Sequence, residues 1–205
     1  MIVTVSRTYG AGGLAVCRAL AERLGYRLLD EELPQTVAVR LGTTPEIVKS
    51  VADRPRGLGE RVLASLAGAV PETGQPAAPS EADLTVASRR VVEDAVRDAA
   101  AAGDVVIVGR MASAILGGRP DVVRVFLSAP LEWRVAHVAE SLGIAADAAR
   151  TEIARIDDAR RSYAKEQYRV PWGDPRHYDL VLDTSRFGTD GSADVLAAAV
   201  RAASA

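Results

Sequence analysis

Three glycines within four residues separate the first apolar run of the chain from its first helical pattern, and this loop constrains the fold more than any other feature. The loop reads Ser6-Arg7-Thr8-Tyr9-Gly10-Ala11-Gly12-Gly13, between the apolar run 2–5 and the helical pattern 13–24. Its glycines let backbone N–H groups converge at a helix N-terminus, where an anion is already favoured. The sequence therefore predicts a phosphate site, although a tight turn that only needs glycine conformations would also account for the glycines.

Further short apolar runs alternate with helical patterns along the rest of the chain. They give candidate strands at 26–29, 105–108, 122–127 and 180–182, with a helix expected at 131–142. The runs are apolar on both faces, as in parallel strands that are buried between helices. The expected fold is therefore α/β, a sheet of five parallel strands in a three-layer arrangement.

More than 70 residues separate the second and third of these strands, far more than one crossover helix requires. We expect a single domain, 1–205, with an acceptor-binding insertion at about 31–83. Within the insertion the patterns predict helices at 44–52 and 59–70, and a longer helix, 83–102, returns to the sheet.

A strongly basic segment lies between the fourth and fifth strands, in a region expected to be irregular from 151 to 177. Its cations are Arg155, Arg160, Arg161, Lys165, Arg169 and Arg176. Asp157 and Asp158 precede the arginine pair, so a solvated helix with internal ion pairs is one interpretation. The position after the fourth strand favours another, an arginine-rich lid at about 157–177 that brings cations over a transferred phosphate.

Composition argues against several other functions. Twenty-five Lys and Arg against 27 Asp and Glu give a net charge of −2, and aromatic residues are only 4%, so neither a basic field nor stacking platforms favour nucleic acid. One cysteine, Cys17, and two distant histidines, His137 and His177, give no metal-ligand spacing, and we assign neither histidine a catalytic role. No apolar stretch approaches a membrane span, and no signal peptide is recognisable. We therefore expect a cytoplasmic protein without nucleic-acid or membrane partners.

Two phosphate-binding motifs compete for the glycine loop. Residues 10–15 fit the dinucleotide motif G-x-G-x-x-[GA], and Asp30 closes the second strand at about the 20-residue spacing where that fold places an acid. In a dinucleotide loop, however, the first glycine follows the strand almost directly, whereas Ser6–Tyr9 intervene here. The long insertion and the basic segment are also foreign to a dinucleotide domain, and they suit a small-molecule kinase.

On these features the chain resembles the cytidylate kinase-like family, a branch of the P-loop nucleoside monophosphate kinases, over nearly its whole length. The matching stretches are Ile2–Gly13 at the phosphate loop, Leu29-Asp-Glu-Glu-Leu33, Val106-Ile-Val-Gly-Arg110, Asp157 with Arg160 and Tyr163, Trp172-Gly-Asp-Pro175 and Tyr178-Asp-Leu-Val-Leu-Asp-Thr184. The resemblance implies a P-loop kinase fold and ATP-dependent phosphoryl transfer to a nucleoside monophosphate, CMP or dCMP first. It also implies Mg²⁺ on the donor phosphates, with a protein ligand that the sequence does not identify.

The resemblance further implies roles for individual residues. The donor phosphates would be held by Ser6, Arg7, Tyr9 and the loop residues Gly10, Ala11, Gly12 and Gly13. Asp30 and Arg110 would face the acceptor. Arg160, Arg161 and Lys165 would act from the lid, where cations neutralise charge on the transferring phosphoryl group. The segment 184–191 would lie beside the donor base.

The loop departs from the motif G-x-x-x-x-G-K-[ST] at positions that matter for catalysis. Gly13 stands where the motif has lysine, and neither Leu14 nor Ala15 offers Mg²⁺ a hydroxyl. Arg7, Arg18 and the lid arginines could compensate for the missing lysine. Two other hypotheses therefore stay open, a kinase of a non-nucleotide small molecule and a nucleotide sensor without catalysis.

Ordinary structural roles compete with function at both acceptor candidates. Asp30 could cap the helix that follows it. Arg110 could form a surface ion pair, although its position at the carboxyl end of a strand favours a ligand-binding role. The alanine-rich helices at 83–102 and 192–203 could pack within one chain or between two, so a homodimer is a further possibility.

Overall fold

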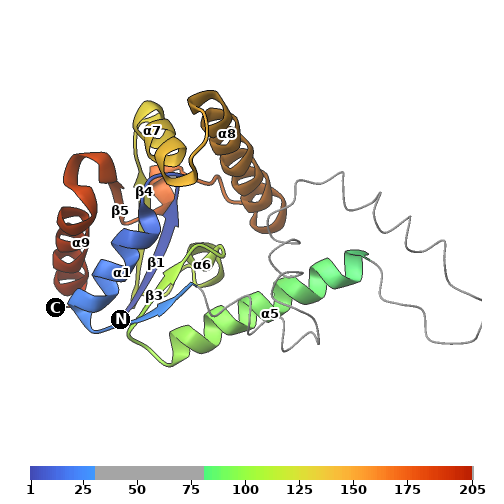
Figure 1. The fold of residues 1–205 in the computed structure, drawn as a ribbon. Helices are drawn as coiled ribbons and strands as arrows, with labels where there is room; N and C mark the ends of the chain where they lie inside the picture. The colour runs from blue at the N-terminus through green and yellow to red at the C-terminus, as the bar shows by residue number, and fades with distance from the viewer. Residues whose placement is uncertain (31–80, 205) are drawn as a thin grey trace, which may run out of the picture. The chain divides into compact units, whose positions relative to one another are not determined.

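The computed structural model describes residues 1–30 and 81–204 (Figure 1). The chain divides into two compact units, one formed by Met1–Asp30 with Val96–Ala205 and the other by Glu31–Ala95. The insertion that the sequence predicts at about 31–83 lies almost entirely outside the described residues, as do its helices at 44–52 and 59–70. These features remain predictions, as does the assignment of 1–205 to a single domain.

The first unit is built on a sheet of five parallel strands in the order β2-β3-β1-β4-β5. The strands are β1 (Ile2–Arg7), β2 (Arg27–Leu29), β3 (Val105–Val108), β4 (Val122–Ser128) and β5 (Leu180–Asp183). The central strand β1 pairs with both β3 and β4, so that Ile2 aligns with Val105 and with Val122. Because all strands run in one direction, their carboxyl ends meet at one edge of the sheet, where ligands of open α/β sheets bind.

Apolar side chains on both faces of the strands bury the sheet between helices. On one face Val3 and Val5 pack against α1 (Gly13–Leu24) and α9 (Thr184–Ala203). On the other face Ile107 packs with residues of α5 (Glu81–Ala101) and α6 (Ala112–Ile115). Figure 1 shows α1 and α9 on one side of the sheet and α6 on the other. The predicted three-layer α/β fold with five parallel strands is confirmed.

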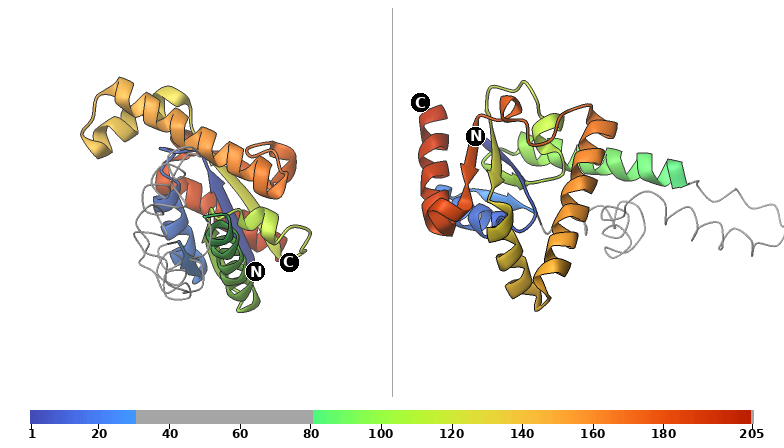
Figure 2. Two further views of the ribbon diagram at one scale, coloured as in Figure 1. Left: turned by 90° about the vertical axis from the view of Figure 1, so that its right-hand side faces the viewer. Right: turned by 90° about the horizontal axis from the view of Figure 1, so that it is seen from above.

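A helical hairpin follows β4 and approaches the carboxyl edge of the sheet (Figure 2). It consists of α7 (Leu131–Leu142) and α8 (Ala146–Tyr163), which are joined after Gly143, a left-handed C-cap with φ 64°. Val135, Val138, Ala149 and Ile153 form its buried seam, and Tyr9 of the glycine loop packs against them. The hairpin is thus anchored on the loop that follows β1.

The region expected to be irregular from 151 to 177 is helical as far as Tyr168, so this prediction was wrong. The helix α8 continues into a π-helical turn, Ala164–Tyr168, and a short 3₁₀ turn follows at Pro175–His177. Ile153, Asp157 and Ala164 are buried along one side of this stretch. Because the buried residue Asp157 is charged, the periodic pattern of apolar residues that marks a helix is interrupted in this stretch. In the described part of the chain, no helix is both long and apolar enough to cross a bilayer.

Candidate functional site

The glycine loop lies where the central strand β1 ends and α1 begins. Gly12 is the N-cap of α1 with φ 67°, no side chain caps the helix, and its first turn contains no acidic residue. A cavity of about 310 Å³ lies against the loop; it is lined by Arg7, Thr8, Tyr9, Gly10, Ala11, Gly12, Gly13, Leu14, Ala15, His137 and Arg160. A helix N-terminus left open in this way, together with converging amides, favours an anion.

Close contacts, and not only turn geometry, require two of the glycines. Gly10 has φ 81°, and a Cβ atom there would lie 2.7 Å from Cγ2 of Val138 on α7. Gly13 does not have a positive φ, but a Cβ atom at this residue would lie 2.8 Å from Cδ of Arg7. The explanation by turn conformation alone therefore fails at Gly13, where the missing side chain leaves room for Arg7.

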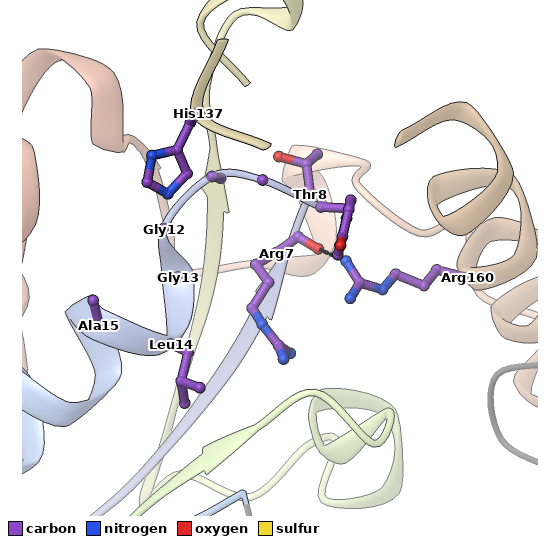
Figure 3. Close-up of a pocket in the computed structure, with 11 residues that line it drawn as sticks. Arg7, Thr8, Gly12, Gly13, Leu14, Ala15, His137 and Arg160 are labelled. Carbon is purple, nitrogen blue, oxygen red and sulfur yellow. Dashed lines mark hydrogen bonds between the residues drawn. The ribbon is translucent and has the colours of Figure 1, made fainter. Parts of the chain in front are cut away.

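Arg160 reaches the loop from α8, as Figure 3 shows. Its Nη1 donates a hydrogen bond to the backbone carbonyl of Arg7 at 2.9 Å, and its guanidinium carbon lies 5.9 Å from the centre of the Tyr9 ring. Its side chain keeps 30% of its surface exposed and lines the cavity. A cation from the distant α8 is thus held beside the phosphate loop.

A buried ion pair fixes the start of the loop to both helices of the hairpin. Asp157 of α8 accepts a hydrogen bond from the backbone N–H of Tyr9 at 2.8 Å and another from Nη1 of Arg134 at 2.7 Å. Arg134 of α7 also donates to the carbonyls of Tyr9 and Ala129. The aspartate that sequence spacing paired with Arg160 has Arg134 as its close partner, while Nη1 of Arg160 stands 3.9 Å away.

Thr184 holds the other end of the loop. Its hydroxyl, buried where β5 passes into α9, donates to the carbonyl of Ala11 at 2.7 Å. Residues 184–191, predicted to lie beside the donor base, form the start of α9, where the helix is broken at Gly188 by a non-helical backbone with φ 64° and ψ −173°. Their relation to a base remains a prediction, whereas the contact of Thr184 with the loop backbone is direct.

The acceptor candidates follow β2 and β3 at the same edge of the sheet. Oδ1 of Asp30 lies 4.0 Å from Nη2 of Arg7, and both side chains are mostly buried. Gly109 and Arg110 follow β3 with φ values of 71° and 54°, so the backbone turns sharply at this point. Arg7 is therefore the link between the loop and Asp30. Whether Asp30 also caps a helix concerns residues beyond the described range.

Other predicted lid cations lie away from the loop. Arg161 is exposed and pairs with the exposed Asp158, and Lys165 is exposed on the π-helical turn. Neither residue lines the cavity, and Ser6, which is buried, does not line it either. Their proposed roles remain predictions, and the structure brings only Arg160 of the three lid candidates to the phosphate loop.

His137 lines the cavity although the sequence analysis gave it no role. Its ring stacks on that of Trp133, one turn earlier on α7, with centroids 5.1 Å apart and planes at 17°. The helix α7 begins directly after β4, at the carboxyl edge where ligands bind. That position was the available signal for its proximity to the loop.

In the described part of the chain, Cys17 is not a reactive nucleophile, and the acidic residues do not form a metal-binding cluster. Burial raises the pKa of the Cys17 thiol to about 12, so the thiolate that would act as a nucleophile is absent near neutral pH. Across residues 1–30 and 81–204, no three His, Cys, Asp or Glu side chains are grouped so that they could hold a metal ion. The open N-terminus of α1 and the guanidinium of Arg160 beside it support anion binding at this site.

Comparisons with known proteins agree with this geometry. The sequence model of the cytidylate kinase-like family matches residues 2–186. The cytidylate kinase of Methanopyrus kandleri is 30% identical over 208 residues, which cover 98% of this chain and 93% of that protein. The cytidylate kinase of Pyrococcus furiosus is 28% identical over 200 residues, covering 98% and 88%.

Solved structures share the fold at lower sequence identity. An uncharacterized protein from Eubacterium ventriosum superposes with a TM-score of 0.65 at 19% identity, covering 98% of each chain. A shikimate kinase from Bacteroides thetaiotaomicron gives a TM-score of 0.55 at 13% identity, again covering 98% of each chain. At such identities the likeness concerns the fold alone, and it agrees with the predicted three-layer α/β architecture.

Proposed function

The chain belongs to the cytidylate kinase-like family, and on this premise we propose that it transfers the γ-phosphoryl group of ATP to a nucleoside monophosphate, with CMP or dCMP as the acceptor. The choice of a cytidine nucleotide is supported by relatives that are cytidylate kinases at 28–30% identity. The phosphotransferase class follows from the family, whereas the acceptor is the part that needs testing.

The observation that carries the proposal is the convergence of Arg160 with the glycine loop. Phosphoryl transfer leaves little covalent work to the protein, so positioning and charge neutralisation supply most of the rate. The loop amides and the open N-terminus of α1 offer a seat for the donor phosphates, and Arg160 lies beside that seat from a separate helix. Arg160 would then stabilise charge on the phosphoryl group as it moves.

In the described part of the chain, the loop positions that carry a hydroxyl in the usual motif provide no ligand for Mg²⁺. Leu14 and Ala15 stand where a hydroxyl would be expected, and Asp30 is the acid near Arg7. Mg²⁺ commonly keeps several water ligands and is held mainly by the phosphates of its substrate. We therefore propose ATP carrying its own Mg²⁺ as the donor and assign the metal no residue of this chain.

The acceptor would occupy the edge of the sheet next to Arg7. Asp30 and Arg110 follow β2 and β3, which lie on one side of β1 in the sheet order. A carboxylate and a guanidinium placed there suit the polar base and the phosphate of a nucleotide. This assignment makes Asp30 and Arg110 the residues to vary when acceptor preference is measured.

A second candidate function is nucleotide binding without transfer. It is favoured by Gly13, Leu14 and Ala15, which lack both the lysine and the hydroxyl of the usual phosphate loop. A kinase of a non-nucleotide acceptor is a third candidate, because the aromatic fraction of only 4% leaves few residues to stack on a base.

The test is ADP release from ATP and Mg²⁺ with CMP, dCMP, UMP, AMP, shikimate or no acceptor, in wild type, Arg160→Ala and Arg155→Ala. Arg155 is the matched control, since it is exposed on the same helix and pairs with Glu152. We expect release that depends on CMP or dCMP, and a fall in kcat of about 100-fold or more in Arg160→Ala with ATP affinity nearly retained.

Arg155→Ala should match wild type. Equal turnover in Arg160→Ala would remove this arginine from the mechanism. ATP binding without release on any acceptor would favour the sensor, and release that depends on shikimate alone would favour a non-nucleotide acceptor.

A further inference from the structure

Two residues of the phosphate loop have exchanged types relative to the motif G-x-x-x-x-G-K-[ST]. With Gly12 as the second glycine of the motif, Arg7 occupies the place of the first glycine and Gly13 occupies the place of the lysine. At position 7 this chain has a long cationic side chain where the motif has glycine, and at position 13 it has glycine where the motif has a long cationic side chain. The inference below rests on the proposed function and identifies the phosphate-binding cation of the same site.

The geometry makes these two side chains mutually exclusive. A Cβ atom at residue 13 would lie 2.8 Å from Cδ, 3.1 Å from Cβ and 3.2 Å from Cγ of Arg7. Real Cβ atoms essentially never approach another heavy atom to less than 3.0 Å. Because the contacts include Arg7 Cβ, a small swing of the arginine tip cannot relieve them. The aliphatic stem of Arg7 fills the space that a side chain at residue 13 would need.

The guanidinium of Arg7 ends between the loop and the acceptor candidates. Figure 3 shows the Arg7 side chain extending away from Thr8 and past Gly13. Its Nη1 would lie 2.8 Å from a Cβ atom at Gly109, and its Nη2 is 4.0 Å from Oδ1 of Asp30. Gly109 thus leaves room for the guanidinium at the end of β3, as Gly13 leaves room for the stem.

We propose that Arg7 has taken over the role of the missing lysine. Gly13 and Gly109 have no side chains, and the space that this leaves allows the Arg7 side chain to reach the phosphates. Arg7 would donate hydrogen bonds to oxygens of the transferring phosphoryl group, which a planar guanidinium can engage in pairs. The acceptor oxygen forms a bond to the γ-phosphorus, and the bond from that phosphorus to the β,γ-bridging oxygen breaks. The electron pair stays on ADP, and Arg7 takes no part in the making or breaking of bonds.

The test is a cycle of three variants, Arg7→Gly, Gly13→Lys and the double variant, assayed for kcat with CMP and for the Kd of ATP. We expect Arg7→Gly to lower kcat by about 100-fold or more, as loss of one stabilising donor does. Gly13→Lys alone should also lose activity, because the new side chain displaces the stem of Arg7. The double variant restores the arrangement of the usual motif and should recover at least 10-fold over Arg7→Gly.

Thermal unfolding of each variant identifies losses caused by misfolding, and Arg119→Ala, an exposed arginine paired with Asp121, controls for loss of one positive charge. A double variant no better than Arg7→Gly, or a Gly13→Lys variant as active as wild type, would overturn the exchange. If wild type binds ATP but transfers no phosphate, the proposed function fails. The exchange is then judged by Kd, which should rise in Arg7→Gly and recover in the double variant. No ATP binding by wild type would overturn both.

Discussion

Removing the carboxylate of Asp157 should destabilise the protein by about 3 kcal/mol, because it leaves the mostly buried guanidinium of Arg134 without its anionic partner and the part-buried N–H of Tyr9 without its acceptor. The side chains of Asp157 and Arg134 are only 10% and 11% exposed. Loss of one partner of such a pair costs about 3–5 kcal/mol. We take the lower end because Arg134 keeps its bonds to the carbonyls of Ala129 and Tyr9.

In a chain of this size each kcal/mol corresponds to about 2–4 °C, so Asp157→Ala should lower Tm by roughly 6–12 °C. Urea unfolding followed by circular dichroism gives the free energy directly. The KM for ATP should rise as well, since the Tyr9 amide that starts the phosphate loop loses its anchor.

Asp158→Ala is the matched control. Asp158 is the next residue of α8, and its ion pair with Arg161 is 69% and 58% exposed on the two side chains, so its loss should cost less than about 0.5 kcal/mol. A cost below about 1 kcal/mol for Asp157→Ala, or equal costs for the two variants, would refute the reasoning that this ion pair anchors the loop.

Two further predictions concern the elements beneath the loop. Thr184→Val should lower the free energy of unfolding by about 1–3 kcal/mol and weaken ATP binding, because the carbonyl of Ala11 loses its hydrogen-bond donor. Thr184→Ser keeps the hydroxyl and should recover most of the stability, measured by urea unfolding, and most of the ATP affinity, measured by calorimetry. Equal stability and equal affinity in the two variants would contradict this role of Thr184. Burial raises the pKa of the Cys17 thiol from 9.0 to about 12. Between pH 9 and pH 12 the thiol is therefore deprotonated in the unfolded state but still protonated in the folded state. The free energy of unfolding should fall by about 1.4 kcal/mol for each pH unit in this range. Cys17→Ala should lack that slope, and a thiol reagent should label native wild type at pH 8 only after unfolding; ready labelling would contradict the burial.

The layers of the fold could be predicted because the signals are local. The helices expected at 13–24 and 131–142 have these bounds in the structure, since periodic apolar residues mark them and glycines follow as left-handed C-caps. The strand predicted at 105–108 is also found as predicted, because a fully buried strand is apolar at every position. Family membership and the kinase class were predicted from the same stretches and are confirmed.

The lid cations show where sequence reasoning stops. Successive residues of an α-helix differ by about 100° in direction, so when Arg160 faces the loop its neighbour Arg161 faces solvent. No spacing rule in a run of arginines tells which one faces inward. The choice depends on how α8 packs against α7, which is a long-range property.

The partners of buried charges were equally hidden. Spacing along the helix suggested that Asp157 and Asp158 pair with the two arginines that follow them, and Asp158 does pair with Arg161. The close partner of Asp157, however, is Arg134, 23 residues earlier on another helix. The approach of Arg7 to Gly13 also depends on the path of a side chain. A glycine that makes room for another residue looks the same in sequence as a glycine that makes a turn.

The most direct test of the central claim is transfer of label from γ-labelled ATP to unlabelled CMP by the purified protein with Mg²⁺, with the nucleotides separated afterwards. We expect label in CDP, in proportion to protein and dependent on CMP, with loss in Arg160→Ala. Label that remains in ATP, or that appears only as inorganic phosphate at the same rate without CMP, would contradict transfer to a nucleoside monophosphate.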